Sequence, residues 1–194
     1  MKIAIVKYNA GNVESVKNAL KRLGVEPILS DDAETLRSAD KVIFPGVGEA
    51  SSAMRYLKER NLDAIIKDLT QPVLGVCLGM QLLCDFSEEN STDCLKILPY
   101  KVRKFDDNEL KIPQIGWNNI FDLKSPLFAG IPENSYVYFV HSFYVESGTE
   151  TIAAADYGAK FSAAVNHKNF YAVQFHTEKS GAVGERILDN FLRL

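Results

Sequence analysis

The sequence predicts an α/β protein with a central, mostly parallel sheet flanked by helices and a β-rich C-terminal half. Over residues 3–83, short apolar segments alternate with amphipathic ones, as strands and helices alternate in βαβ units. Over residues 96–175, short segments rich in β-branched and aromatic residues are instead separated by turns. With 194 residues, of which 46% are apolar, the chain is expected to form a single domain over residues 1–194.

In the N-terminal half, strands and helices are predicted to alternate with right-handed crossovers. A turn at 10–12 introduces the first helix, and Gly24 follows that helix as a C-terminal cap. The polar side chains at 30–32 are suited to cap the second helix. The expected strands lie at 3–6, 25–29, 42–44 and 73–76, and the expected helices at 13–23, after 30–32, around 54–57, around 62–69 and at 80–83.

In the C-terminal half, most segments have the composition of strands. A polar loop is expected at 87–93 and a turn at 106–108. Apolar positions on one face of the last segment predict a helix at 181–192. The expected strands lie at 100–105, 112–119, 136–145, 151–156, 161–166 and 170–175.

Composition limits the class of partner and the compartment. A formal charge of −3 gives no electrostatic reason to expect nucleic acid or an anionic membrane, so small molecules or proteins are the expected partners. Three cysteines without a CxxC pair predict neither a disulfide framework nor a metal site. The N-terminal apolar segment is too short for a signal peptide and no segment is long enough to span a membrane, so a reducing, cytoplasmic location is expected.

Cys77 lies at the centre of the most informative segment, residues 73–83. It follows an apolar strand and precedes a helix, and Gly75 and Gly79 flank it in a Gly-x-Cys-x-Gly pattern. This is the spacing of a nucleophile elbow, in which glycines permit a sharp turn that lifts one strained side chain clear of the sheet. The sequence therefore predicts a cysteine nucleophile.

His176 and Glu178 supply the proton-transfer groups that such a nucleophile needs. They follow the predicted strand at 170–175 at positions i and i+2, so in an extended chain both side chains face the same side, about 6.6 Å apart along the backbone. The imidazole takes the proton of the thiol and returns it to a leaving group, while the carboxylate fixes the imidazole tautomer. Cys77, His176 and Glu178 therefore form a candidate catalytic triad from two strand ends.

Other residues of reactive type have ordinary interpretations. Cys84 and Cys94 are expected to be small buried hydrophobes, and His167, beside a predicted hairpin turn, to be a surface residue. The strand-end position of His141 is compatible with a structural or a ligand-facing role. The loop Pro-Gly-Val-Gly at 45–48 follows a buried strand at the edge where α/β proteins bind ligands, although such glycines often serve only a turn.

Five motifs together resemble the class I (triad) glutamine amidotransferases, which have a flavodoxin-like fold. Within that class the chain is similar to the family of glutaminase subunits of imidazole glycerol phosphate synthase, an enzyme of histidine biosynthesis. The motifs occur in the order of that family and cover nearly the whole chain. They are Pro-Gly-Val-Gly at 45–48, Gly-Val-Cys-Leu-Gly-Met-Gln at 75–81, Gly-Trp-Asn at 116–118, Tyr-Phe-Val-His-Ser at 138–142 and Gln-Phe-His-x-Glu-Lys-Ser at 174–180.

This resemblance implies a reaction and a role for each matching residue. Cys77 would form a γ-glutamyl thioester, with His176 as acid and base and Glu178 as its orienter. Ammonia then leaves and water resolves the thioester. The backbone N–H groups of Leu78 and, after a peptide rearrangement, Val47 would bind the oxyanion. The further positions implied to bind glutamine are Gly46, Gly48, Gln81, Ser142 and Phe143.

The resemblance also implies a protein partner and no cofactor. The partner is a (β/α)8-barrel cyclase that forms a heterodimer with the chain and receives ammonia through its core. That cyclase makes imidazole glycerol phosphate and aminoimidazole-carboxamide ribotide. The positions that match partner-facing residues of the family are Asn12, Trp117, Tyr138 and Lys179.

Four positions at three sites depart from the pattern of the family. Thr177 replaces a usual proline, Glu49-Ala50 replaces a common Ala-Phe, and Phe143 replaces a frequent tyrosine. Other functions also stay open at this point. The chain is compatible with a paralogous subunit that supplies ammonia to another pathway such as surface-sugar synthesis, with a catalytically silent scaffold, and with a cysteine peptidase or hydrolase. The intact triad weighs against the scaffold.

Overall fold

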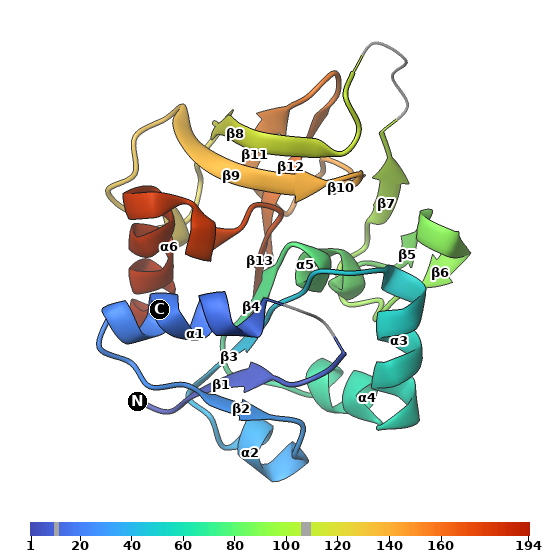
Figure 1. The fold of residues 1–194 in the computed structure, drawn as a ribbon, viewed down its shortest axis with the longest axis vertical. Helices are drawn as coiled ribbons and strands as arrows, with labels where there is room; N and C mark the ends of the chain where they lie inside the picture. Colours follow the sequence, from blue (N-terminus) through green and yellow to red (C-terminus); the bar gives the residue numbers. More distant parts are fainter. Residues whose placement is uncertain (10–11, 106–109) are drawn as a thin grey trace.

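The computed structural model describes residues 1–9, 12–105 and 110–194 (Figure 1). The predicted turn at 106–108 and the first two residues of the predicted turn at 10–12 lie outside the described residues. Within the described part, no helix is long and apolar enough to cross a membrane. In that same part, no group of three or more His, Cys, Asp and Glu side chains is placed to hold a metal ion.

Five neighbouring strands of the large sheet run parallel, as the sequence predicts. In spatial order they are β2 (Ile28–Ser30), β1 (Ile3–Val6), β3 (Lys41–Phe44), β4 (Val73–Val76) and β13 (Phe170–Val173). Although β13 is the last strand of the chain, it lies directly beside β4, with Val173 opposite Val76. The carboxyl ends of β4 and β13 therefore meet at the same edge of the sheet.

Beyond β13 the pairing becomes mostly antiparallel, and a second, two-stranded sheet packs over this half (Figure 1). The additional strands of the large sheet are β12 (Lys160–His167), β11 (Thr151–Asp156), β10 (Phe143–Val145), β7 (Lys101–Lys104), β5 (Phe86–Ser87) and β6 (Thr92–Asp93). The small sheet consists of β8 (Gln114–Ile120) and β9 (Ser135–His141). This is the β-rich C-terminal half that the sequence predicts.

Helices cover both faces of the parallel strands because successive side chains of a strand point to opposite faces. On one face, Ala4 and Val42 pack with α2 (Ala33–Arg37), α3 (Ala50–Glu59), α4 (Leu62–Lys67) and α5 (Leu78–Leu83). On the other face, Ile3 and Ile43 pack with α1 (Val13–Arg22), α6 (Gly181–Arg193) and the inner side of the small sheet. The two layers of side chains make the core that holds the strand ends in place.

Three predicted elements need correction. The strand predicted at 25–29 is β2, which starts only at Ile28 because the N–H of Val25 still bonds to the carbonyl of Leu20 in the last turn of α1. The polar loop predicted at 87–93 contains β5, a 3-10 turn at Glu89–Ser91 and β6. The single strand predicted at 136–145 is divided at Ser142, where the chain passes from the small sheet to the large one.

Candidate active site

Cys77 occupies a strained turn between β4 and α5, as the nucleophile elbow predicts. Its φ of 53° and ψ of −110° are unusual for a residue with a side chain, and such a conformation costs about 1–3 kcal/mol. Close packing explains the flanking glycines. A Cβ on Gly79 would overlap the carbonyl of Phe44, and one on Gly75 would lie 3.1 Å from the backbone nitrogen of Met80. The N–H of Cys77 donates to Val173 at 2.8 Å, which ties the turn to β13.

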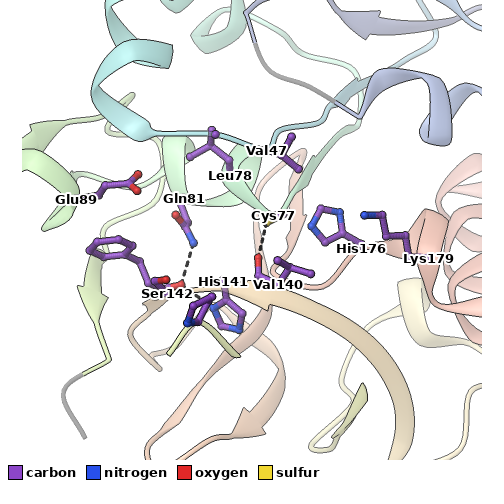
Figure 2. Close-up of a pocket in the computed structure, with 13 residues that line it drawn as sticks. Val47, Cys77, Leu78, Gln81, Glu89, Val140, His141, Ser142, His176 and Lys179 are labelled. Atoms are coloured by element: carbon purple, nitrogen blue, oxygen red, sulfur yellow. Dashed lines mark hydrogen bonds between the residues drawn. The ribbon is translucent and has the colours of Figure 1, made fainter. Parts of the chain in front are cut away.

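His176 and Glu178 follow β13 and lie close together, as predicted. The chain between them is not extended as expected, because Thr177–Lys179 form a 3-10 turn, and this turn brings the two side chains together. His176 Nδ1 lies 2.7 Å from Glu178 Oε1, and both side chains are almost completely buried. Two further contacts fix the backbone of the histidine: its N–H donates to Tyr138 at 2.9 Å, and its carbonyl accepts from the hydroxyl of Ser180 at 2.6 Å. With Nδ1 engaged, Nε2 is the ring nitrogen left to meet the thiol of Cys77 (Figure 2).

The electrostatic surroundings of His176 favour its protonated form. Burial alone would lower the pKa of this imidazole, but the neighbouring Cys77 thiol and Glu178 carboxylate outweigh burial and raise the pKa of His176 to about 10. A protonated imidazole beside a sulfur atom is the arrangement that stabilises a thiolate. The three residues therefore have the geometry of a thiol nucleophile with its acid–base partner and orienter.

Asn12 lies closer to the catalytic groups than its expected partner-facing role suggests. Its side-chain N–H donates to Glu178 Oε1 at 2.5 Å, so one carboxylate oxygen accepts from both Asn12 and His176. Asn12 precedes α1 with a left-handed φ of 69° and is partly exposed. It connects the start of α1 to the triad carboxylate, which the sequence pattern alone does not reveal.

A cavity of about 300 Å³ opens in front of Cys77 (Figure 2). It is lined by most of the residues expected to bind glutamine or the oxyanion. Gly46 does not line it; a Cβ on this glycine would meet Tyr8 and Leu78. The expected binding residues on the wall are Val47, Gly48, Leu78, Gln81, Ser142 and Phe143. The catalytic residues Cys77 and His176 also line the cavity, as does Lys179, which was expected to face the partner. The other lining residues are Glu89, Pro113, Val140 and His141.

Gln81 is held so that only its carbonyl oxygen is left for a ligand. Its amide nitrogen donates to the Phe143 carbonyl at 2.9 Å and to Gln174 at 3.0 Å, which uses both of its N–H groups. Gln174 in turn places its own amide nitrogen 3.7 Å from the sulfur of Cys77. The Phe143 carbonyl also accepts from His141, so both of its lone pairs are used. The Ser142 carbonyl accepts from the N–H of Phe105 at 3.1 Å, which leaves one lone pair free. Glutamine can therefore contact 142–143 through this oxygen, the N–H groups or the Ser142 side chain.

His141, whose role the sequence left open, supports the wall of this cavity. It is buried, and its Nδ1 and Nε2 lie 2.7 Å from the Phe143 carbonyl and 2.9 Å from the Gln114 amide. Burial lowers the pKa of His141 to about 4 and makes it neutral at physiological pH. In the neutral ring Nδ1 donates to the Phe143 carbonyl, while Nε2 lies beside Gln114 Oε1. His141 thereby braces the bend at Ser142.

The two expected oxyanion donors are not both available in this conformation. The N–H of Leu78 donates to the carbonyl of Gly46 at 3.3 Å. In a trans peptide the carbonyl and the next N–H point in opposite directions, so the N–H of Val47 points away from Cys77. A turn of the Gly46–Val47 peptide would remove that carbonyl and bring in the Val47 N–H, which is the rearrangement the resemblance implies. Gly48, which follows Val47, has a φ of 130°, a conformation that favours glycine.

Glu89 is a pocket residue that the sequence analysis missed. One of its oxygens accepts from the N–H of Ala50 at 2.7 Å, and the side chain lines the cavity opposite His176 (Figure 2). Burial raises the pKa of Glu89, and the nearby Glu49 carboxylate adds to that rise. Its sequence position in a polar segment carried no signal, because only the fold brings residues 89 and 50 together. It supplies a negative charge at the far end of the cavity from the thiol.

A strained cysteine on a strand-to-helix turn, with a histidine–glutamate pair on the next parallel strand, defines an α/β enzyme of the thiol-dependent hydrolase type. The sequence model named Glutamine amidotransferase class-I matches residues 4–194. The chain belongs to this family, and the family predicted from the motifs is confirmed.

Individual relatives extend over the whole chain. It is 57% identical over 196 aligned residues to imidazole glycerol phosphate synthase subunit HisH of Bacteroides fragilis strain YCH46, with 100% of both chains covered. It is 47% identical to the protein of the same name from Pasteurella multocida, covering 98% of this chain and 96% of that one.

Solved structures agree with the fold. One glutamine amidotransferase superposes with a TM-score of 0.77 at 18% identity, covering 100% of this chain and 98% of the other. Another, from Thermotoga maritima, has a TM-score of 0.64 at 17% identity, covering 100% and 83%. These likenesses confirm the predicted fold class.

The two buried histidines should titrate far apart in the free protein. A pH titration of the ring NMR signals is expected to give a pKa of about 4 for His141 and about 10 for His176. Glu178→Gln removes a negative partner and should lower only the pKa of His176. An unchanged value in that variant would contradict the pairing.

The same shift has a consequence for stability. The folded pKa of His176, about 10, lies above its unfolded value near 6.5, about the usual one for histidine. Its contribution to the free energy of unfolding is therefore fully present below about pH 6.5 and is lost as the pH rises through about 10.

Thr177, which the resemblance implies replaces a proline, lies in surroundings that suit proline. Its hydroxyl is buried and has no hydrogen-bond partner among the described residues. The preceding His176 is extended, with φ of −86° and ψ of 102°, and Thr177 is the first residue of a 3-10 turn at Thr177–Lys179. A residue before proline prefers the extended region, and proline fits the first position of a helical turn.

Thr177→Pro should therefore stabilise the protein. Fixing φ in a compatible backbone lowers the entropy of the unfolded chain, so the free energy of unfolding should rise by about 0.4–1 kcal/mol in urea denaturation. Thr177→Val is the matched control, because it removes the unpaired hydroxyl and leaves φ free. A Thr177→Pro protein less stable than wild type would show that the bend requires a φ that proline cannot adopt.

Proposed function

We propose that this protein is the glutaminase subunit of an imidazole glycerol phosphate synthase, supplying ammonia to a (β/α)8-barrel cyclase in histidine biosynthesis. The observation that carries the proposal is the full-length identity of 57% to a relative that bears the subunit name. The triad geometry supports the same reading, because the residues that hydrolysis needs are in place in this chain. A surface-sugar pathway has no comparable observation in its favour.

The reaction proposed for the triad follows from its geometry. The Cys77 sulfur attacks the side-chain amide carbon of glutamine, and His176 passes a proton to the departing ammonia. A water molecule, deprotonated by His176, then attacks the thioester and releases glutamate and the thiol. Glu178 keeps the proton of the imidazole on Nδ1, so that Nε2 faces the reacting atoms. The proton that ammonia takes comes from the Cys77 thiol through His176, and the proton that His176 takes from water returns to the Cys77 sulfur.

The oxyanion of each tetrahedral intermediate is assigned to the N–H groups of Leu78 and Val47. Donors aimed at such an oxyanion typically contribute about 2.7–4 kcal/mol each to the transition state. In the conformation described, the Gly46 carbonyl occupies the Leu78 donor. The chain alone is therefore proposed to be a weak glutaminase whose activity rises when a partner favours the turned peptide.

An apolar, largely aromatic surface beside the active site is proposed as the face that meets the cyclase. It lies on the outer side of the small sheet, where Ile115, Trp117 and Tyr136 are 58%, 55% and 60% exposed. The Trp117 ring also contacts Tyr138, with centroids 5.9 Å apart. Exposed aromatic side chains of this kind are enriched in protein interfaces. Tyr138 links this surface to the triad, because its carbonyl accepts a hydrogen bond from the N–H of His176.

Recognition of glutamine is assigned to the polar groups that remain free in the cavity. Glutamine carries an α-ammonium group, and Glu89 is the one carboxylate among the described residues that line this cavity. Gln81 offers its carbonyl oxygen, and Gly48 offers its backbone. Charge complementarity therefore orients the substrate with its ammonium group at Glu89 and its side-chain amide at Cys77.

Cys77→Ala tests the function directly when the chain is assayed with its cyclase. Glutamine-dependent synthesis should fall to background, while synthesis from added ammonium salts should continue at the wild-type rate. The measurement is product formation from the ribulosyl nucleotide with each nitrogen source. Loss of both activities would indicate a damaged complex, and retention of the first would exclude Cys77 as the nucleophile.

Glu89→Gln tests the orientation of the substrate. The change keeps the acceptor for Ala50 and removes the charge, and a hydrogen bond to a charged group contributes about 1.5–3 kcal/mol. The KM for glutamine should therefore rise by about 10- to 100-fold with little change in kcat. Glu88→Gln is the control, since Glu88 carries the same charge but does not line the cavity. Equal KM values in the two variants would contradict the assignment.

A further inference from the structure

Tyr8 is a buried tyrosine that neither the motifs nor the proposed reaction uses. It follows β1, is only 7% exposed, and packs its ring against Phe44 with centroids 5.2 Å apart. Its hydroxyl donates to the carbonyl of Pro45, the first residue of the loop at 45–48. Burial raises the pKa of Tyr8 well above its usual range, so the group stays a donor.

The hydroxyl also lies against the next residue of the loop. A Cβ on Gly46 would overlap the Tyr8 oxygen and would come within 2.9 Å of the Leu78 Cβ. Gly46 is therefore confined between Tyr8 on one side and the start of α5 on the other. The space at this position therefore excludes any residue with a side chain.

The peptide that Tyr8 holds is not the peptide that must turn. The Pro45 carbonyl belongs to the Pro45–Gly46 peptide, whereas the oxyanion site requires rotation of the Gly46–Val47 peptide. Rotating the second peptide changes ψ of Gly46 and φ of Val47 and leaves the first peptide where it is. A hydrogen bond to the first peptide therefore fixes the pivot about which the second one rotates.

We propose that Tyr8 is a positioning residue for the oxyanion site, anchoring the Pro45–Gly46 peptide so that only the Gly46–Val47 peptide turns and the Val47 N–H arrives facing Cys77. The proposal rests on the proposed glutaminase function. It requires the hydroxyl as well as the ring, because the ring alone leaves the buried Pro45 carbonyl without this partner. An unanchored loop spreads over several conformations, and the N–H of Val47 is then aimed correctly in only a fraction of them.

The test compares Tyr8→Phe with wild type, each in complex with the cyclase and its nucleotide ligand. The glutaminase kcat should fall about tenfold, a fraction of the roughly 10²–10³-fold loss caused by removing an oxyanion donor outright. The KM for glutamine should stay within about twofold, because the substrate groups at Glu89 and Gln81 are untouched. Tyr8→4-aminophenylalanine, which restores an N–H donor on the same ring, should recover most of the lost kcat.

Two controls separate positioning from general damage. Alkylation of Cys77 by iodoacetamide forms no oxyanion, so its rate should be the same in Tyr8→Phe and wild type. Tyr100→Phe removes another buried tyrosine hydroxyl, one that bonds to Glu150 rather than to the loop, and should keep the wild-type kcat.

Several results would overturn the proposal. One is an unchanged kcat in Tyr8→Phe, and another is an equal loss of kcat in Tyr100→Phe. A third is Cys77 alkylation in Tyr8→Phe that slows by the same factor as kcat, and a fourth is no recovery of kcat with 4-aminophenylalanine. A wild-type complex without glutaminase activity would overturn the proposed function instead. If Tyr8→Phe does not fold, the 4-aminophenylalanine protein provides the test. A kcat far below wild type together with a normal alkylation rate would then show that a hydrogen-bond donor at this position does not position the oxyanion site.

Discussion

The parallel pairing of β13 with β4 is the constraint on which the site depends. The two strands are almost a hundred residues apart in the chain, and their register places Val173 opposite Val76, so that their next residues leave the sheet side by side. The bond from the Cys77 N–H to the Val173 carbonyl locks the elbow to that register. A shift of one residue would turn every following side chain to the other face and separate the histidine from the thiol. Triad geometry therefore depends on strand pairing as well as on local conformation.

Local patterns predicted what depends on short-range physics. The glycines around Cys77 indicate a tight turn, and the i, i+2 spacing of His176 and Glu178 indicates that these two side chains lie together. The structure shows both features. The break at Ser142 has no such signal, because apolar and aromatic residues typical of strands continue on both sides of it. The strand is interrupted because its neighbours change: β9 pairs with β8, whereas β10 pairs with β7 and β12. This change of partner depends on residues that are distant in the sequence. Glu89 was not predicted for the same reason, since its place at the cavity depends on residues distant in the sequence.

Asn12 and Tyr138 show how the exposed small sheet and the catalytic groups form one connected unit. The carbonyl of Tyr138 fixes the backbone of His176, and the amide of Asn12 shares the oxygen of Glu178 that orients the imidazole. Both residues were expected to face a partner because of the resemblance to the family. In the fold they are each one hydrogen bond away from the triad. A protein that packs against this surface therefore acts on atoms bonded to the triad, and no long chain of intermediates is needed to carry its effect.

The resting state of the loop at 45–48 must be held by more than the bond from Leu78 to Gly46. That bond is long at 3.3 Å, and a typical hydrogen bond contributes about 0.5–1.5 kcal/mol, which favours one conformation only about 2- to 12-fold. A hundredfold dependence on a partner requires about 2.7 kcal/mol. The remainder has to come from contacts that differ between the two arrangements of the moving peptide. The frame around that peptide is the same in both: the Phe44 carbonyl lies against Gly79, the Pro45 carbonyl accepts from Tyr8, and the Ala50 N–H donates to Glu89. Because these contacts restrain both ends of the loop, its change of shape is confined to one peptide between two discrete arrangements. A two-state element of that kind is what a bound partner can bias, since the partner needs only to favour one arrangement over the other.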